Sequence, residues 1–308
     1  MRLMCRSAEF EELTACSALL GGSNVYSMAV RKEVVPVLQR YWRQGSLITT
    51  VFEDLDKREI VGLSIEVFIR DTFLEEIRVF PKPYLREELI RRELAGQSVV
   101  LSMAEAQVEN ASNGLNLFFI NDPLPLHTLS ADEFRAIDVQ WGEILYDYRA
   151  CNLKTITWEC YSEQSLEMGL SCGMKQIAYP AQHDGTAARV HLTSITREQA
   201  LSQYGTHVSQ MFIYAPARFQ FTGGQQELLR RALMGETDEA LSEGLYLSLS
   251  AIKKRWLAIY DRVRAIDPYL LPDDDTGRQT RGTEKRRFLL HYLRTHPEEL
   301  HPINALRA

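Results

Sequence analysis

The chain has 308 residues, of which 45% are hydrophobic and 25% charged, and these values are ordinary for a globular protein long enough to form two domains. Five scattered cysteines, an odd number without a Cys-x-x-Cys pair, argue against a disulfide framework or a metal site. No apolar run approaches the ~20 residues of a membrane span and no signal peptide is recognisable, so we expect a cytoplasmic protein that does not contact membranes.

The formal net charge of −6 is unevenly distributed along the chain. From residue 216 onward there are 15 basic and 13 acidic side chains, a balance of +2, which leaves −8 for the front part. The back part is therefore mildly basic, as a nucleic-acid-binding segment would be.

Strand and helix patterns alternate through the front two thirds of the chain, which predicts an α/β fold. The predicted elements, in chain order, are a strand over 2–7, helices over 10–20 and up to about 42, a hairpin over 47–54 and 60–69, one or two helices over 81–114, a strand over 115–122, a helix over 132–149, a strand over 153–161, a helix over 162–173, a hairpin over 174–180 and 188–195, and a helix over 196–212.

This order of elements resembles the GNAT acyltransferase fold over roughly residues 1–195. The resemblance implies a mixed sheet with flanking helices and a turn after the fourth strand whose backbone N–H groups cradle the pyrophosphate of acyl-CoA. The corresponding segment here, 121–132, has the sequence NDPLPLHTLSAD, with two prolines and no glycine. We therefore expect no coenzyme A binding and no enzyme activity, and predict a sensory or assembly domain over 1–212.

Other candidate residues in the front domain leave alternatives open. Six aromatic residues could line a pocket for a small-molecule effector, or could be ordinary core, which the spacing favours. An acid/base set in the 121–132 loop lacks a nucleophile motif, and the histidines near 183–191 do not have a metal-ligand spacing. The aromatic residues are Phe118, Phe119, Trp141, Tyr146, Tyr148 and Trp158; the polar ones are Asp122, His127, Asp132, His183, Asp184 and His191.

Residues 221–263 show the pattern of two short helices followed by a longer one. Thr237 and Ser248 are placed as N-caps, and Gly235 follows the first helix where a positive φ is expected. In the longer helix, an apolar stripe at helical spacing should be buried, while basic side chains begin the opposite face. The stripe consists of Ile252, Trp256, Ile259 and Val263.

This stretch resembles the LuxR-type helix-turn-helix of bacterial transcription regulators over about forty residues without a gap. The residues that carry the resemblance are Phe221-Thr222, Glu227-Leu228-Leu229, Gly235, Leu241-Ser242, Leu247-Ser248 and Ala251-Ile252-Lys253. The sequence departs from the family at Ala251, where a hydroxyl is common, and at Leu257, where a polar base-reading residue is common.

The resemblance implies a DNA interface on the third helix. Lys253, Lys254 and Leu257 would face base edges. Nearer the phosphates would lie Ser248, Ser250, Arg255 and Arg262. The implied partners are double-stranded DNA and a second copy of the chain in a homodimer, and no cofactor or metal is expected.

The sequence therefore predicts a GNAT-like α/β domain over 1–212, followed by an all-α helix-turn-helix domain over 213–308. The predicted function is sequence-specific transcription regulation. Two alternatives remain: an acyl-CoA-dependent acyltransferase with a divergent cofactor loop, and a protein-docking module.

Overall fold

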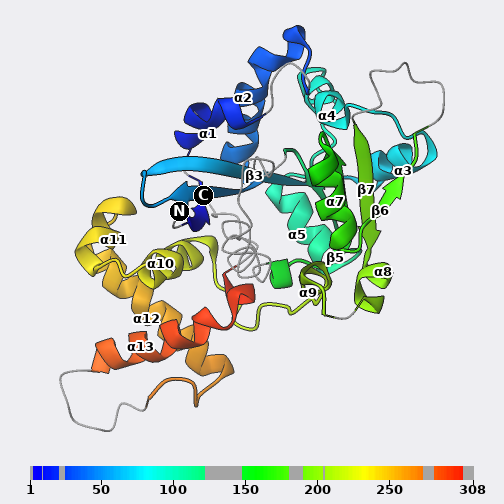
Figure 1. Cartoon of the computed structure of the whole chain (residues 1–308). Coiled ribbons are helices and arrows are strands. Elements are labelled where there is room, and N and C mark those ends of the chain that lie inside the picture. Colours follow the sequence, from blue (N-terminus) through cyan, green and yellow to red (C-terminus); the bar gives the residue numbers. More distant parts are fainter. Residues whose placement is uncertain are drawn as a thin grey trace. The chain divides into compact units, whose positions relative to one another are not determined.

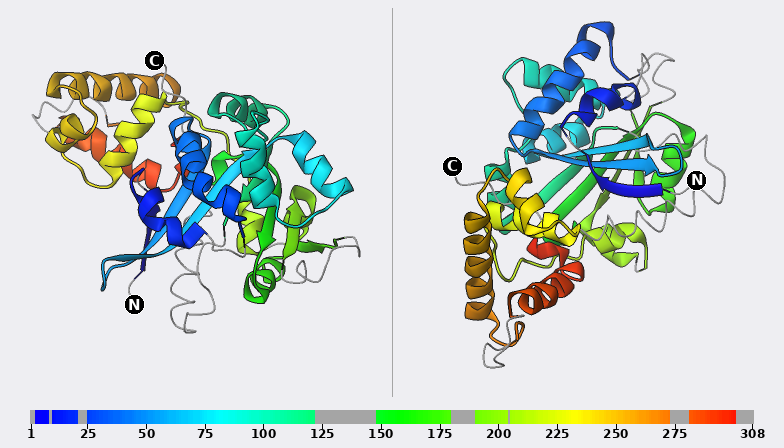
Figure 2. Two further views of the ribbon diagram at one scale, coloured as in Figure 1. Left: turned by 90° about the horizontal axis from the view of Figure 1, so that it is seen from above. Right: turned by 90° about the vertical axis from the view of Figure 1, so that its left-hand side faces the viewer.

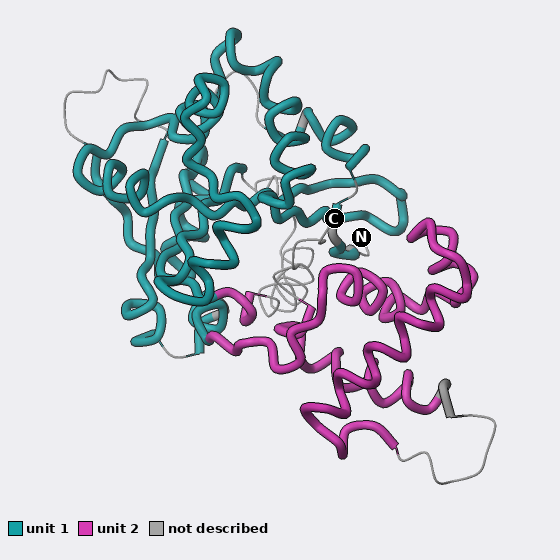
Figure 3. Tube along the Cα trace, turned by 180° about the vertical axis from the view of Figure 1, so that it is seen from behind, with its two compact units in different colours: residues 1–146, 152–213 teal, residues 147–151, 214–308 magenta. Residues whose placement is uncertain are grey.

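The computed structural model describes residues 3–8, 10–20, 25–121, 148–179, 190–203, 205–272 and 281–300. The chain separates into two compact units, and each unit is made of two segments that are not contiguous in sequence. Unit 1 contains residues 1–146 and 152–213, and unit 2 contains residues 147–151 and 214–308 (Figure 3).

Unit 1 is built on a seven-stranded mixed sheet among its described residues, with the strand order β1-β2-β3-β4-β5-β7-β6 (Figure 1). Every neighbouring pair is antiparallel except β4 and β5, which run parallel in the middle of the sheet. The strands are β1 (Leu3–Ser7), β2 (Leu47–Asp54), β3 (Glu59–Ile69), β4 (Leu115–Phe119), β5 (Leu153–Cys160), β6 (Lys175–Ile177) and β7 (His191–Thr196).

Helices cover the two faces of this sheet. The helices of unit 1 are α1 (Glu12–Ala15), η1 (Cys16–Leu20), α2 (Met28–Arg43), α3 (Asp71–Val79), α4 (Leu85–Leu94), α5 (Met103–Ala111), α7 (Glu163–Ser171), α8 (Arg197–Ser202) and α9 (His207–Met211). Apolar side chains of α1, η1, α2, α3 and α4 form one core with Ile65 and Phe118 of the sheet, and α1 and α2 lie together on that side (Figure 2). On the opposite face, Gly169 of α7 lies against Trp158 and Thr193.

The predicted α/β architecture with a mixed sheet and flanking helices is confirmed. The one or two helices predicted over 81–114 are α4 and α5. Helix α3 was not predicted, because it begins directly after the strand and has only a narrow apolar face. One local prediction was wrong. The helix predicted over 196–212 is two helices, since Thr196 and Thr206 each cap a separate N-terminus. Most of the helix predicted over 132–149 lies outside the described residues.

Unit 2 contains helices only, among its described residues. They are η3 (Tyr148–Ala150), α10 (Gly223–Leu233), α11 (Asp238–Gly244), α12 (Leu249–Ile266), α13 (Arg281–Arg294) and η5 (Pro297–Glu299). Thr237 caps α11 and Ser248 caps α12, as predicted, and Gly235 has a φ of 89°. The predicted apolar stripe of α12 is buried in the core of the unit.

The turn between α11 and α12 contains an unusual tyrosine. Tyr246 has a φ of 53°, in the left-handed region that favours glycine, and it is 96% exposed. The assignment of α10, α11 and α12 to a LuxR-type helix-turn-helix domain is not confirmed by these features, because caps and buried stripes occur in helices of any function.

Candidate active site at the carboxyl end of the parallel strands

Strand β4 is paired with β5 over its whole length, from Leu115 to Phe119, whereas β5 continues for two residues beyond the ladder. Their ladder ends at Phe119 and Trp158. Beyond Phe119 the chain stays bonded to β3, because the Ile120 N–H donates to the Ile65 carbonyl oxygen at 2.8 Å. The Asn121 side chain continues this attachment: its Oδ1 accepts from the Ile65 N–H at 2.8 Å.

Strand β5 is paired with β7 on its other side from Thr155 to Cys160. Glu159 and Cys160 still pair with β7 after the ladder to β4 has ended. Side-chain hydroxyls of β7 strengthen the attachment, since Thr193 Oγ1 donates to the Trp158 carbonyl oxygen at 3.1 Å and Ser194 Oγ to that of Ile156 at 3.0 Å. We call the fork the point past Phe119 and Trp158, where the β4–β5 ladder has ended while the chain after β4 stays bonded to β3 and β5 stays paired with β7.

A fork between parallel strands is a favourable place for a ligand. In open α/β sheets, ligands bind in the crevice outside the carboxyl ends of parallel strands. Main-chain groups that have left one ladder are also available to an extended chain that bears amides. The residues that follow β4, from 122 to 147, lie outside the described residues.

A buried polar cluster lies where β5 reaches the fork; we call it the Glu159 cluster, formed by Glu159, Arg86, Tyr161, Tyr26 and Tyr179. The Glu159 side chain is fully buried and accepts from the backbone N–H groups of Leu85 at 3.0 Å and Arg86 at 3.2 Å. The Tyr161 hydroxyl donates to Glu159 Oε2 at 2.6 Å. The Arg86 guanidinium donates to the Glu159 carbonyl oxygen and lies 4.3 Å from the centre of the Tyr161 ring.

Burial dominates the protonation chemistry of this cluster. It raises the pKa of Glu159 above the ordinary carboxyl range, and the nearby Arg86 opposes that shift only in part. Burial also raises the pKa of Tyr26 to about 12 and that of Tyr161 well above its ordinary value. The pKa of Tyr179 is raised by burial and by the charge of Glu159. The phenols therefore keep their protons at neutral pH, beside a carboxylate that is a stronger base than usual.

Tyr26 differs from the other members of the cluster. Its side chain is 2% exposed, and among the described residues its hydroxyl has no hydrogen-bond partner. Its pKa responds to Arg86 and Glu159, which places the hydroxyl within electrostatic reach of both. A buried hydroxyl without a partner is costly, and such groups occur where a ligand or water supplies the missing bond.

Carboxylates fix helix α4 over this end of the sheet. Glu87 accepts from the Ser27 N–H at 2.6 Å and from the Ser27 hydroxyl at 2.9 Å, which ties α4 to the start of α2. Further along, Glu93 accepts from Tyr41 of α2 at 3.1 Å. Tyr84, at the N-cap of α4, is held in the left-handed region with a φ of 67°. The cluster is thus supported by rigid elements, as a pre-organised site requires.

The cluster was not predicted from the sequence. The strand 153–161 was predicted, yet a single Glu in it gave no sign of its backbone partners, which lie 73 and 74 residues earlier. The available signal was a carboxylate inside an otherwise buried strand, which must be hydrogen-bonded if it is to be stable.

The aromatic candidates are core residues. Phe118, Phe119, Tyr148 and Trp158 are all buried, and the rings of Phe119 and Trp158 lie 6.0 Å apart. This supports the core alternative for these four. Outside the described residues lie Trp141, Tyr146, Asp122, His127, Asp132, His183 and Asp184.

His191 is described and lies in β7. Its Nε2 is 3.1 Å from the Glu163 carboxylate and its Nδ1 is 3.2 Å from Gln176 Nε2. Among the described residues, no group of three or more His, Cys, Asp or Glu is placed to hold a metal ion. Likewise, no described helix is both long and apolar enough to cross a membrane.

The predicted DNA-contacting residues lie on or just before α12. The Ser248 hydroxyl accepts from the Ala251 N–H at 3.2 Å as the helix cap. Arg255 donates to the Gly224 carbonyl oxygen at 3.2 Å, and Arg262 to that of Gln220 at 2.8 Å. The remaining predicted contacts are exposed: Ser250, Lys253, Lys254 and Leu257.

No protein-family model matches the chain, and no curated protein matches it. Among solved structures, the chain is similar to mutant forms of the spermidine/spermine N-acetyltransferase SpeG from Vibrio cholerae, with 13% identity over 66% of this chain and 99% of that one, and a TM-score of 0.37. A chimera of SpeG with hSSAT gives 13% identity over 66% and 100%, with a TM-score of 0.39. SpeG with manganese ions gives 13% identity over 66% and 97%, with a TM-score of 0.37.

These findings correct the functional prediction. A DNA-binding transcription regulator without enzyme activity was predicted, whereas the matched structures are acetyltransferases and agree with the acyltransferase alternative. Nothing in the comparisons supports a LuxR-type regulator.

Proposed function

We propose that the chain is an acyltransferase that uses an acyl-CoA thioester as donor. The observation that carries the proposal is the fork between β4 and β5, the one parallel pair among the described strands. The pantetheine arm of CoA is an extended chain with two amides, which suits the main-chain groups at a strand edge. The absence of glycine from 121–132 leaves the fork, rather than a phosphate-binding turn, as the main support for the donor.

The Glu159 cluster has the groups that acyl transfer needs. An acceptor amine or hydroxyl attacks the thioester carbonyl carbon, the C–S bond breaks, and CoA leaves as a thiolate. The acceptor must lose a proton and the thiolate must gain one. Glu159, with its raised pKa, serves as the base, and Tyr26, whose hydroxyl has no partner among the described residues, serves as the proton donor.

The first test is donor binding by the full chain. Acetyl-CoA at 100 times its dissociation constant should stabilise the protein by about 2.7 kcal/mol, which thermal unfolding would detect. Release of the CoA thiol in the presence of a panel of amines and alcohols should then exceed the rate without protein. If millimolar acetyl-CoA produces no stabilisation and no thiol release, the proposal is refuted.

The Tyr26→Phe variant tests the role of the cluster. It removes only a hydroxyl without a hydrogen bond among the described residues, so the free energy of unfolding should stay the same or rise. Donor affinity should stay near that of the wild type, while kcat falls by about 100-fold if Tyr26 supplies the proton. An unchanged kcat would remove Tyr26 from the mechanism.

A further inference from the structure

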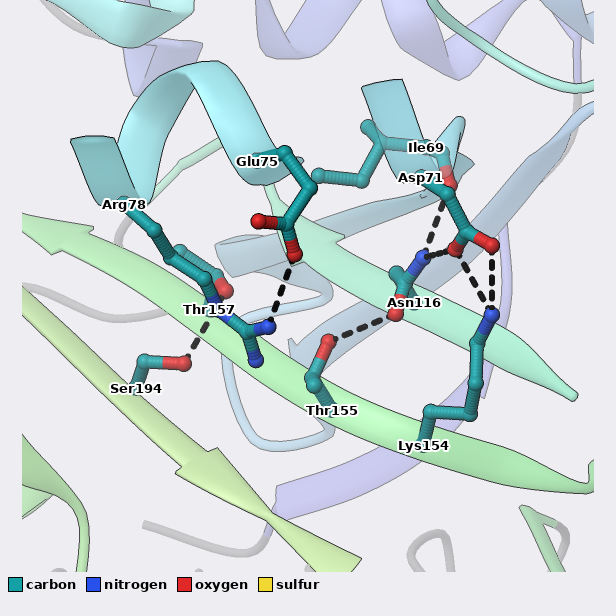
Figure 4. A network of polar contacts seen from close by, with 9 residues as sticks. All are labelled: Ile69, Asp71, Glu75, Arg78, Asn116, Lys154, Thr155, Thr157 and Ser194. Carbon is teal, nitrogen blue, oxygen red and sulfur yellow. Dashed lines mark hydrogen bonds and ion pairs between the residues drawn. The ribbon is translucent and has the colours of Figure 1, made fainter. Parts of the chain in front are cut away.

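The opposite end of the parallel pair, at the amino ends of β4 and β5, holds a second polar network (Figure 4). Asn116 of β4 is 2% exposed, and its Nδ2 donates to Asp71 Oδ1 at 2.6 Å. Its Oδ1 accepts from the Thr155 hydroxyl of β5 at 2.9 Å. Lys154 of β5 donates to both oxygens of Asp71, at 2.6 and 2.9 Å. We call Asp71, Asn116, Lys154 and Thr155 the amino-end clasp.

A register shift brings Lys154 into the clasp. Leu115 of β4 pairs with Leu153, but the next residue, Asn116, pairs with Thr155. Lys154 is therefore an extra residue on β5, and a β-bulge of this kind bends its strand and re-aims a side chain. The side chain of Lys154 reaches Asp71 at the start of α3 (Figure 4). Because the ammonium donates to it, the pKa of Asp71 is held below its ordinary value.

The clasp joins three separate parts of the chain. Asp71 belongs to α3, which lies in the helical segment between β3 and β4, and it ties that segment to both parallel strands. The neighbouring pair on α3, Glu75 and Arg78 at 3.1 Å, is confined to the helix. The clasp therefore couples strands, whereas the adjacent ion pair does not.

We propose that the amino-end clasp positions the fork for the acyl donor, an inference that rests on the proposed function. Lys154 and Glu159 are five residues apart on β5, about 16 Å along an extended strand. With the strands fixed at one end by the clasp, and β5 bonded to β7 and β4 to β3 at the other, the bulge sets the direction in which β5 leaves β4. The clasp residues do not touch the donor; they act through the course of the strands.

Three variants of the full chain test this inference. Asn116→Leu removes the buried amide, and Lys154→Met removes the ammonium while keeping most of the stem. Lys154→Arg restores a cation and should rescue the effect. Glu75→Gln is the matched control, because it breaks an exposed ion pair on the same helix without touching a strand.

Amide hydrogen exchange of the ligand-free protein gives a readout that is independent of donor binding. Asn116→Leu and Lys154→Met should speed exchange in Phe118–Ile120 and Trp158–Cys160 by at least about threefold, while amides of the β2–β3 hairpin keep their wild-type rates. Glu75→Gln and Lys154→Arg should leave both regions unchanged. Equal acceleration across the whole sheet, or none at the fork, would overturn the inference.

Kinetics with acetyl-CoA give the second readout. Loss of the clasp should raise the KM for the donor between about threefold and thirtyfold and leave kcat near the wild-type value, because the chemistry of the Glu159 cluster is intact. A fall in kcat with an unchanged KM contradicts a positioning role at the fork. If the wild type binds no acetyl-CoA, the proposed function fails, and the exchange experiment alone decides whether the clasp sets the fork.

Discussion

Gly114, directly before β4, occupies a position that has no room for a larger residue. Its φ is 89°, and a Cβ at this position would lie 2.6 Å from the carbonyl oxygen of Asn152. Gly96 also has a positive φ, 72°, but nothing lies within 4 Å of a Cβ there. A substitution at Gly96 therefore measures the cost of left-handed backbone alone, and the same substitution at Gly114 adds the cost of a steric clash.

We expect Gly96→Ala to lose about 1–2 kcal/mol of stability, the cost of left-handed backbone for a residue with a Cβ. Gly114→Ala should lose clearly more, because backbone must move as well. Urea unfolding of both variants measures the difference. Equal losses would show that the Asn152 segment moves away at no cost.

Residue-scale prediction succeeded where the signal was local and failed where it was not. Ser248 and Thr237 were predicted as caps because a cap and the N–H it binds are three residues apart. Glu159 and Asn116 could not be assigned in this way, since the backbone N–H groups that bind Glu159 lie 73 and 74 residues away and the Thr155 hydroxyl that binds Asn116 lies 39 residues away. Each is a polar residue in a strand, and the strand pattern reports only which face is buried.

At the scale of elements, α5 begins with a capping box. The Glu105 N–H donates to Ser102 Oγ at 3.3 Å, and Glu105 accepts from the Ser102 N–H at 2.8 Å. The Ser102 N–H, the Arg70 guanidinium and the Ser102 hydroxyl all donate to the Glu105 carboxylate, and they lower its pKa to about 2. The helix has no buried residues, so its stability depends on this cap more than on packing.

Ser102→Ala should therefore cost about 1 kcal/mol. The pKa of Glu105 is lower in the folded chain than the ordinary value of 4.5, so its contribution is present above pH 4.5 and is lost as the pH falls toward 2. Glu105→Gln should remove this part of the acid dependence in urea unfolding between pH 5 and 2. An identical acid dependence in the variant would show that the Glu105 charge contributes nothing to stability, which is common for exposed charges.

Elements with a strong period were predicted best. The β2–β3 hairpin follows from two strand-like runs separated by the mostly polar segment 55–59, and the buried stripe of α12 follows from helical spacing. Helix α3 was missed because Phe73, Leu74 and Ile77 form its short apolar face, which cannot be separated from the end of a strand by pattern. The helices that suggested DNA binding also show why function could not be predicted from the same signals. Caps and apolar stripes specify that a segment is a helix, but they do not specify what the helix binds.

At the scale of the whole molecule, each unit has its own apolar core and its own buried carboxylate. In unit 2, Glu299 is fully buried and accepts from the N–H groups of Arg218 and Phe219, both at 2.9 Å. The neighbouring Glu298 is also buried, yet its Oε2 has no partner among the described residues.

Glu299→Ala should destabilise unit 2 by about 2–4 kcal/mol, because one buried and one part-buried N–H group lose their acceptor. Glu298→Gln is the control and should change stability by less than about 1 kcal/mol. Hydrogen exchange of α10 and α12 amides reports the loss in unit 2, and amides of the β2–β3 hairpin report unit 1. Loss of protection in the hairpin alone would contradict this assignment.

The capping of α4 has a consequence for how the chain folds during synthesis. The carboxylate that binds the first N–H of α4 is translated 74 residues after that helix. Until β5 leaves the ribosome, the start of α4 lacks its acceptor, and β4 lacks its parallel neighbour. Unit 1 therefore cannot be completed hairpin by hairpin: its centre closes late and in one cooperative step, as expected when non-local pairings dominate.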